Sequence, residues 1–411
     1  MKKCILILML AGLSIMVKGQ SKEQPIVLAH IDTVYSNILK EKRPVWVYTP
    51  SYDTSYFSKP SYPVLYVFDG DGYFMSLVTM IKQLGVINGN TVLPEMIIVG
   101  VLNTPGNRNR DLTPTKNDVF DRSSGGGERF TAFLEKELIP YIDKNYATAP
   151  YRMLIGHSLG GLMVVNTLIN HTNLFNAYAA LDPSMFYDDG KLLKQTDVLL
   201  KTKNFKGRAL FLGIANTMYE GMDTAQVRKD TTAITGHIRS ILKFADNLKK
   251  QPENTLKWGY KYYPDDDHAS MTLIAEYDAL RFIFHNNRFP RNQPENQYFD
   301  KRLSADTLRK MITTHYEQLS QEMGYAVRPP EFSINQFGYI MLQLKEYDKA
   351  KMFFQVNIGY YPQNFNAYDS LGDYYLAKGD KVNAIKYFKK ALSLKHTSEI
   401  NDKLKKLEQQ N

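Results

Sequence analysis

One serine stands among glycines in the stretch "YRMLIGHSLGGLMVV", residues 151–165. Its centre, Gly156-His157-Ser158-Leu159-Gly160, matches the pattern G-x-S-x-G, whose small residues allow a tight, strained turn that exposes a serine hydroxyl. The apolar residues on both sides predict a strand that ends at Gly156 and a helix that begins just after Ser158. The pattern therefore predicts Ser158 as the nucleophile of an acyl transfer.

A serine hydroxyl is a poor nucleophile until a histidine takes its proton, and the chain order expected here is serine, acid, histidine. His268, in "YYPDDDHASM", follows a predicted strand and precedes a predicted helix. His237 falls inside an amphipathic segment that predicts a helix. We therefore predict His268 as the base, and the alternative is a surface histidine on an acidic turn.

The acid is expected in the loop "ANTMYEGMD", after the predicted strand 207–214. Glu220 is the preferred candidate and Asp223 the alternative. Asp182, in "ALDPSM", is a third option, while Asp267 adjoins the histidine but points elsewhere if its loop is extended. A serine–histidine pair with a weak third member stays open as well.

An oxyanion needs two backbone N–H donors. One is expected at Leu159, directly after the nucleophile, and the other near Asp71 in the loop "FDGDGYFM", where Gly70 and Gly72 permit a close approach of the backbone. A plain glycine-rich turn would have the same sequence.

A long irregular stretch, residues 103–127, carries Arg108, Arg110 and Arg122. Long loops in compact domains often serve function. We expect Arg108 and Arg110, together with His157, to contact an anionic or polyhydroxylated substrate. The alternative is that these arginines pair with aspartates of the same loop.

Alternating strands and helices must position these residues. Short apolar runs predict strands at 43–49, 63–69, 95–102, 151–156, 176–181, 207–214 and 259–264, with "PIVLAHI" as an eighth candidate before them. Helix-length segments lie between most of them, including 125–145, 159–170, 226–249 and 269–286. This alternation predicts an α/β fold with a mostly parallel sheet covered on both faces, and ligand sites at the carboxyl ends of its strands.

The strands stop at about residue 306, where the chain begins to repeat itself. Gly338, Ala350 and Phe354 recur 34 residues later as Gly372, Ala384 and Phe388. This period resembles the tetratricopeptide repeat, in which paired helices touch through small residues. We expect an all-α domain over 304–411 with repeats at about 331–364 and 365–398, flanked by the helices 304–323 and 398–410, and a linker at 290–303.

The first residues resemble a secretory signal peptide. Lys2 and Lys3 precede an apolar run, Cys4–Val17, that is too short to span a bilayer, so residues 1–19 are expected to be removed. No later segment is apolar enough for a membrane helix. Cys4 is the only cysteine, which excludes disulfides, cysteine nucleophiles and thiolate metal sites after cleavage. Secretion without disulfides fits a bacterial periplasm, and an extracellular destination stays open.

The formal charge of +9 does not indicate a nucleic-acid partner. Residues 378–411 hold nine lysines against four acids, so most of the excess is a solvated helical tail. Stacking, phosphate-binding and metal-binding motifs are absent from the sequence, so neither a cofactor nor a metal is predicted.

Five stretches follow one another as they do in the esterase D and enterochelin-esterase-like branch of the α/β-hydrolases. They are "PVLYVFDGDGYF", "RNRDLTPT", "GGGERFTAFLEKELIPYIDKNY", "RMLIGHSLGGL" and "DDDHASM", within residues 25–286. The resemblance implies an α/β-hydrolase fold over 20–289 and ester hydrolysis through an acyl-serine with Ser158, His268 and a carboxylate. Substrates in this branch range from siderophore lactones to feruloyl, acetyl and formyl-thiol esters.

Together these patterns favour a periplasmic or secreted serine carboxylic-ester hydrolase, acting on a small ester such as a siderophore or carbohydrate-linked ester. A protein partner could bind the repeats. The alternative is an inactive hydrolase scaffold that acts as an adaptor through those repeats.

Overall fold

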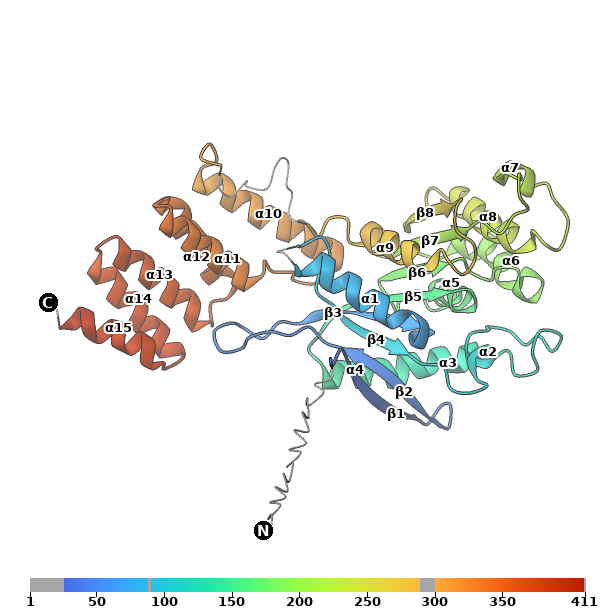
Figure 1. Cartoon of the computed structure of the whole chain (residues 1–411), viewed down its shortest axis with the longest axis horizontal. Coiled ribbons are helices and arrows are strands. Elements are labelled where there is room, and N and C mark those ends of the chain that lie inside the picture. Colours follow the sequence, from blue (N-terminus) through green and yellow to red (C-terminus); the bar gives the residue numbers. More distant parts are fainter. Residues whose placement is uncertain (1–25, 88–89, 289–299, 410–411) are drawn as a thin grey trace, which may run out of the picture.

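The computed structural model describes residues 26–87, 90–288 and 300–409. Residues 26–288 form an α/β unit and residues 300–409 a helical unit, which extends from one side of the α/β unit (Figure 1). The predicted signal peptide, residues 1–19, lies outside the described residues, as does most of the predicted linker, 290–303. Within the described ranges, we find no helix with both the length and the apolar character needed to span a membrane.

The α/β unit is built on one eight-stranded sheet with the order β1-β2-β4-β3-β5-β6-β7-β8. The strands are β1 His30–Ser36, β2 Glu41–Tyr48, β3 Tyr62–Phe68, β4 Ile97–Val101, β5 Thr148–His157, β6 Ala177–Leu181, β7 Ala209–Ala215 and β8 Lys257–Tyr263. Strand β2 runs antiparallel to both of its neighbours, β1 and β4, and the other neighbouring strands are parallel. Seven strands match the predicted runs, whereas the run "PIVLAHI" overlaps β1 only at its end, because β1 forms from the alternating residues that follow it.

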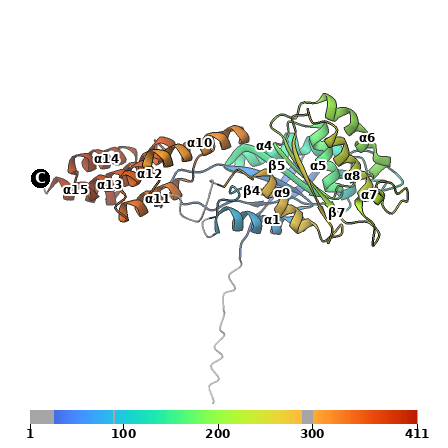
Figure 2. The same cartoon turned by 90° about the horizontal axis from the view of Figure 1, so that it is seen from above.

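Helices cover both faces of this sheet, as Figure 2 shows from above. In the α/β unit they are α1 Gly70–Gly85, α2 Arg108–Asp111, α3 Gly127–Phe133, the π-helical turn η2 Leu134–Leu138, α4 Ile139–Asn145, α5 Leu159–Asn170, α6 Tyr187–Thr202, α7 Thr224–Val227, α8 Gly236–Lys249 and α9 Thr272–Ile283. Helices α1 and α9 pack on one face, and α3 to α6 and α8 on the other. The predicted α/β-hydrolase fold is confirmed.

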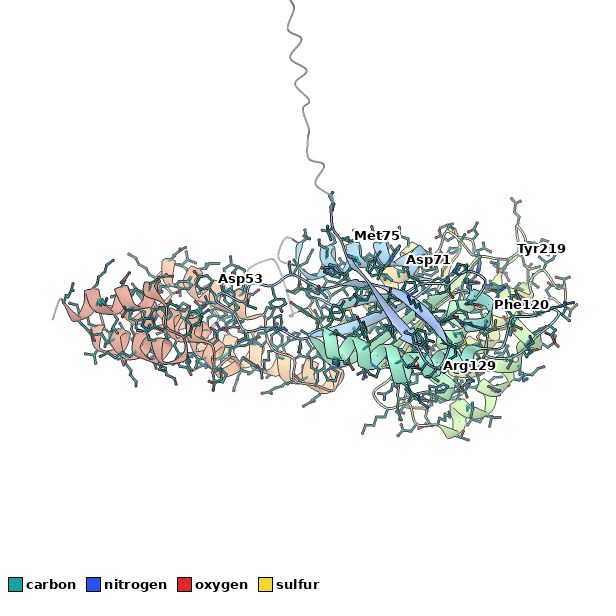
Figure 3. The ribbon with its side chains drawn as sticks, turned by 90° about the horizontal axis from the view of Figure 1, so that it is seen from below. Asp53, Asp71, Met75, Phe120, Arg129 and Tyr219 are labelled. Carbon is teal, nitrogen blue, oxygen red and sulfur yellow. The ribbon has the colours of Figure 1, made fainter. Side chains whose placement is uncertain are left out.

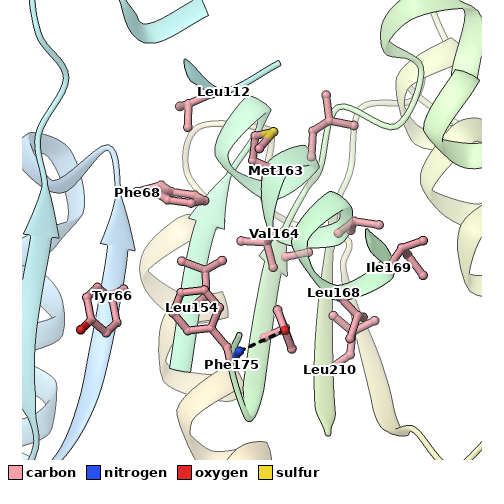
Figure 4. Packing of buried hydrophobic residues seen from close by; sticks show 14 of the residues in the cluster. Tyr66, Phe68, Leu112, Leu154, Met163, Val164, Leu168, Ile169, Phe175 and Leu210 are labelled. Carbon is pink, nitrogen blue, oxygen red and sulfur yellow. Dashed lines mark hydrogen bonds between the residues drawn. The ribbon is translucent and has the colours of Figure 1, made fainter. Parts of the chain in front are cut away.

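Helix α5 follows the serine turn and is buried on all sides. Every residue from Leu159 to Ile169 is buried, and Met163, Val164 and Leu168 pack into the main apolar cluster (Figure 4). A helix that is apolar all round belongs inside a core. Its position, and with it the position of the turn before it, is therefore fixed by packing.

The helical unit contains α10 Ala305–Met323, α11 Glu331–Gln343, α12 Tyr347–Tyr360, α13 Phe365–Ala377, α14 Lys381–Leu394 and α15 Ser398–Glu408. The pairs α11–α12 and α13–α14 correspond to the two predicted repeats. A Cβ built on Gly338 would lie 2.4 Å from a ring carbon of Phe354, and one on Gly372 would lie 2.5 Å from a ring carbon of Phe388. The repeated glycines are thus the points where the paired helices touch.

The segment between β2 and β3, residues 49–61, contacts the helical unit, and we call it the β2–β3 arm. It reaches the first turns of α11 and α13, and Figure 3 places Asp53 beside the helical unit. The backbone N–H of Ser58 donates to Glu331 at 2.9 Å, and the rings of Phe57 and Phe332 meet edge to face at 5.6 Å. The helical unit therefore docks on the α/β unit through specific contacts.

Candidate active site

Ser158 lies in a strained turn at the carboxyl end of β5. Its backbone φ is +57°, a left-handed value that non-glycine residues rarely adopt. A Cβ built on Gly156 would lie 2.6 Å from the backbone of Gly160, and one on Gly161 would lie 3.0 Å from Pro183, so the turn can close only on glycines. The predicted elbow is present, and it lifts the Ser158 hydroxyl above the sheet.

His268 lies beside this serine, on the loop after β8. Its Nε2 is 3.1 Å from Ser158 Oγ, within hydrogen-bond distance. Asp267 holds the loop, because its carboxylate accepts the backbone N–H groups of Ala269 and Ser270 at 2.9 Å each. The structure brings the predicted nucleophile and base together, while the loop forms a turn and the Asp267 carboxylate is engaged within that turn and not with the His268 ring.

The carboxylate that contacts His268 is that of Asp182, the residue directly after β6. His268 Nδ1 lies 2.5 Å from Asp182 Oδ2, and the backbone N–H of Ala215 donates to Oδ1 at 2.9 Å. Asp182 is completely buried. Burial alone would raise the pKa of this carboxyl, but hydrogen bonds from His237, His268 and the Ala215 amide outweigh burial and hold the pKa below its ordinary value.

The prediction that Glu220 or Asp223 faces His268 is wrong. Both side chains are exposed in the loop after β7, where Asp223 caps α7 by accepting from the backbone N–H groups of Ala225 and Gln226. The physical reason lies in the strand order: β6 is the direct neighbour of β5, so its end lies next to Ser158. The loop after β7 turns outward instead. Asp182, the third option from the sequence, has the position of the acid.

A second histidine, which lies inside helix α8 as its amphipathic segment predicts, also reaches Asp182. His237 of α8 lies with Nε2 2.7 Å from Asp182 Oδ2, and its ring meets that of His268 at 4.9 Å and nearly at right angles. A lone histidine in an amphipathic helix carries no signal that distinguishes this contact from a surface position. Only the three-dimensional arrangement identifies it.

Asp182, His237 and His268 form, among the described residues, one group of three whose ligand atoms could hold a metal. Two donors on a tetrahedral zinc, each about 2.0–2.1 Å from the ion, lie about 3.3 Å apart. The separations here are 2.7 and 2.5 Å, which are hydrogen-bond lengths. The geometry fits shared protons better than a shared ion.

Two helix N-termini meet beside Ser158. Helix α5 begins at Leu159, and α1 begins at Gly70, so the glycine-rich stretch expected to be a loop is the first turn of a helix. A Cβ on Gly160 would lie 3.3 Å from the carboxylate of Asp69, which shows how closely the two turns approach. First-turn amides lack an intrahelical acceptor. The amides of Leu159 and Asp71 are therefore candidates for stabilising an oxyanion, as the sequence predicts.

The two arginines predicted to bind substrate have different surroundings. Arg108 binds the carboxylate of Asp69 through Nε and Nη2 at 2.6 and 2.8 Å and remains 38% exposed beside the turn. Arg110 donates to both Glu41 and Asp111, so its guanidinium is occupied by carboxylates. The structure thus favours the ion-pair alternative for Arg110 and leaves Arg108 near the site.

His157 braces the base and does not face the substrate side as predicted. It is 7% exposed, its Nε2 lies 2.8 Å from the carbonyl oxygen of His268, and its Nδ1 lies 2.9 Å from the Tyr73 hydroxyl. A carbonyl only accepts, so Nε2 carries the proton and Nδ1 accepts from Tyr73. Burial, together with nearby His268, lowers the pKa of His157 to about 4. The ring is therefore neutral at pH values well above 4.

Comparisons with known proteins agree with this geometry. The family described as "Putative esterase" matches residues 36–237, and a tetratricopeptide repeat matches residues 365–396. Ferri-bacillibactin esterase BesA of Bacillus subtilis is 32% identical over 252 residues, covering 56% of this chain and 84% of that protein. Apo-salmochelin esterase of Escherichia coli O6:H1 is 28% identical over 240 residues, covering 55% of this chain and 70% of that protein.

A solved structure extends the likeness beyond the α/β unit. The crystal structure of an IroE-like serine hydrolase from Shewanella oneidensis superposes with a TM-score of 0.65 at 29% identity, and the match covers 80% of this chain and 99% of that one. Sheet order, serine turn and sequence relatives thus lead to one assignment: the chain is a hydrolase that belongs to the esterase family of the α/β-hydrolases and carries tetratricopeptide repeats in its C-terminal part.

Proposed function

We propose that this chain is a serine carboxylic-ester hydrolase that works through an acyl-serine at Ser158. The observation that carries the proposal is the chain of contacts from Ser158 Oγ to His268 at 3.1 Å and from His268 to Asp182 at 2.5 Å. The triad is recognised by such geometry and roles, because the same constellation recurs on unrelated folds.

The reaction follows from these contacts. His268 Nε2 takes the proton of Ser158 as Oγ attacks the ester carbonyl, and the buried Asp182 stabilises the imidazolium that forms. The backbone N–H groups of Leu159 and Asp71 stabilise the negative oxygen of the tetrahedral intermediate. His268 then gives its proton to the departing alcohol, and a water molecule, activated by the same histidine, releases the acid and restores Ser158.

For the substrate we propose a siderophore ester. The support comes from the relatives, two of which are named for esters of bacillibactin and salmochelin. The surroundings of the triad fit a substrate with apolar or aromatic groups, since Phe186 is 45% exposed and contacts the ring of His237. Phe120, 46% exposed, packs on Tyr187 nearby. Arg108 adds a partly exposed guanidinium, paired with Asp69, beside the turn that carries Ser158. Export through the signal peptide belongs to the same proposal.

Hydrolysis of p-nitrophenyl butyrate tests the ester-hydrolase activity, and hydrolysis of a siderophore triester tests the proposed substrate. Ser158→Ala should lower kcat by at least about 1,000-fold, as expected for loss of a triad nucleophile. The matched control is Ser184→Ala, since Ser184 Oγ lies 3.3 Å from Ser158 Oγ, and it should keep activity within about tenfold. A wild type without activity and without fluorophosphonate labelling at Ser158 would favour the adaptor alternative. Activity on p-nitrophenyl butyrate alone would reject only the siderophore substrate.

A further inference from the structure

Asp182 accepts two histidine hydrogen bonds on a single oxygen. His268 Nδ1 and His237 Nε2 lie 2.5 and 2.7 Å from Oδ2, while the backbone N–H of Ala215 occupies Oδ1 at 2.9 Å. An ionised carboxylate can only accept, so both histidines must donate. The reaction as written above needs the contact with His268 and gives no role to His237.

His237 is held rigidly where it meets the carboxylate. It lies in the first turn of α8, whose Ile238 and Ile241 are completely buried, and its carbonyl accepts from Ser240 Oγ at 2.6 Å. Its ring packs edge to face on Phe186 at 5.4 Å, and 17% of the side chain is exposed. Helix packing thus sets the position of the Nε2 donor.

We propose that His237 is a positioning residue for the triad: its Nε2–H holds Asp182 Oδ2 in the plane that meets His268 Nδ1. The inference rests on the proposed function and adds a residue to it. Asp182 sits in a turn with φ of +42°, at the end of a strand, where the backbone alone does not set the rotation of the carboxylate. The Ala215 amide fixes one oxygen, and His237 fixes the other.

The roles of the two histidines are not interchangeable. His268 bridges Asp182 and Ser158 with its two ring nitrogens, whereas His237 contacts only the Asp182 oxygen, from a ring that lies 4.9 Å from that of His268. His237 therefore touches neither the nucleophile nor the substrate in this scheme. Removing His237 should lower kcat and leave KM nearly unchanged, because its hydrogen bond to Asp182 stabilises the transition state and does not contribute to substrate binding in the ground state.

Two amide substitutions separate the effect of the hydrogen bond that His237 donates from the effect of its side-chain packing. The side-chain nitrogen of glutamine reaches the place of a histidine Nε2, whereas that of asparagine reaches only the place of Nδ1. His237→Gln should keep kcat within about threefold of wild type. His237→Asn and His237→Leu should lose roughly 10- to 100-fold, less than the ~10⁴-fold typical of removing the triad carboxylate function. The melting temperature of each variant shows that it is folded.

A low-field proton NMR signal gives a readout that does not require turnover. The proton shared by His268 and Asp182 should resonate far downfield in the wild type, shift in His237→Asn and His237→Leu, and return in His237→Gln. Wild-type kcat and an unshifted proton in folded His237→Asn would overturn the inference, as would equal losses in all three variants. A wild type that shows the proton and its shifts but no Ser158-dependent hydrolysis would reject the proposed function and not the positioning role.

Discussion

Asp182 and His268 are 86 residues apart in the chain, yet Oδ2 of the first lies 2.5 Å from Nδ1 of the second. The strand order explains the contact. Asp182 ends β6, which lies directly beside β5 and its Ser158, and His268 follows β8 two strands further on. The intervening β7 contributes the Ala215 amide to the same carboxylate. The three residues of the proposed triad thus converge from three strand ends of one mostly parallel sheet.

The position of the acid can be tested by paired amide substitutions. Asp182→Asn should lower kcat by about 10⁴-fold, because a neutral amide neither orients His268 correctly nor stabilises its cation. Glu220→Gln removes an exposed carboxylate from the loop after β7 and should leave kcat within about twofold. Steady-state kinetics on p-nitrophenyl butyrate give both values. A large loss in Glu220→Gln with little change in Asp182→Asn would contradict the structure.

The contact between Tyr73 and His157 should matter for stability and for rate. Tyr73→Phe removes the hydroxyl that donates to the buried Nδ1 and leaves that nitrogen without a donor, at a cost of about 1–3 kcal/mol. Since His157 also holds the carbonyl of His268, kcat should fall more than KM changes. Urea unfolding and kinetics measure the two effects, with the exposed Tyr219→Phe as control. Equal stability of both variants would show that the hydroxyl is dispensable.

Glu276 should make the protein less stable as the pH rises. It is 1% exposed, and burial raises its pKa to about 8 from an ordinary 4.5. Between these values the folded state keeps a proton that the unfolded state has lost, so the free energy of unfolding falls with increasing pH, by up to about 5 kcal/mol in total. Above about pH 8 the loss is complete.

Glu276→Gln removes this titration. Its free energy of unfolding should match that of the wild type near pH 4.5 and exceed it by several kcal/mol, on the order of 3–5, at pH 9. Urea unfolding across this pH range measures the difference, and Glu253→Gln, at an exposed position after α8, is the control. Parallel pH profiles of wild type and Glu276→Gln would show that the carboxyl ionises without cost.

The repeat glycines offer a sharp test of packing in the helical unit. Gly372→Ala would place a Cβ 2.5 Å from the ring of Phe388 and should destabilise the unit by about 1–3 kcal/mol through overpacking. Gly359, within α12, has open space around its Cβ position, so Gly359→Ala should be neutral or stabilise by up to about 1 kcal/mol. Thermal unfolding followed by circular dichroism compares them. Similar melting temperatures for the two variants would argue against close helix contact at Gly372.

The sequence predicts those features that depend on local patterns. The strands, the serine turn and the repeat helices follow from apolar periodicity, from the spacing of glycines around Ser158 and from the recurrence of Gly338 at Gly372. The family resemblance adds the α/β-hydrolase fold. His268 is identifiable because it follows a strand in the expected chain order.

Other features depend on which strand ends are neighbours in space, and the sequence does not encode this locally. Asp182 and Glu220 both follow apolar strands, and only the adjacency of β6 and β5 selects Asp182. The sequence predicts substrate contacts for Arg110 and His157, because nothing in their spacing reveals their actual partners, Glu41 and Tyr73. His237 lies on a helix whose pattern shows which face is apolar but not which carboxylate it meets.

The helical unit meets the α/β unit where the parallel strands start, not where they end. The β2–β3 arm precedes β3, Lys257 at the start of β8 pairs with Glu322 of α10, and Met323 packs in the cluster that holds Tyr151. Ser158 lies at the other end of β5, about 20–30 Å away at ~3.3 Å per residue. The helical unit and Ser158 thus lie at opposite ends of the parallel strands. A partner bound at the helical unit therefore leaves the Ser158 end of the sheet uncovered.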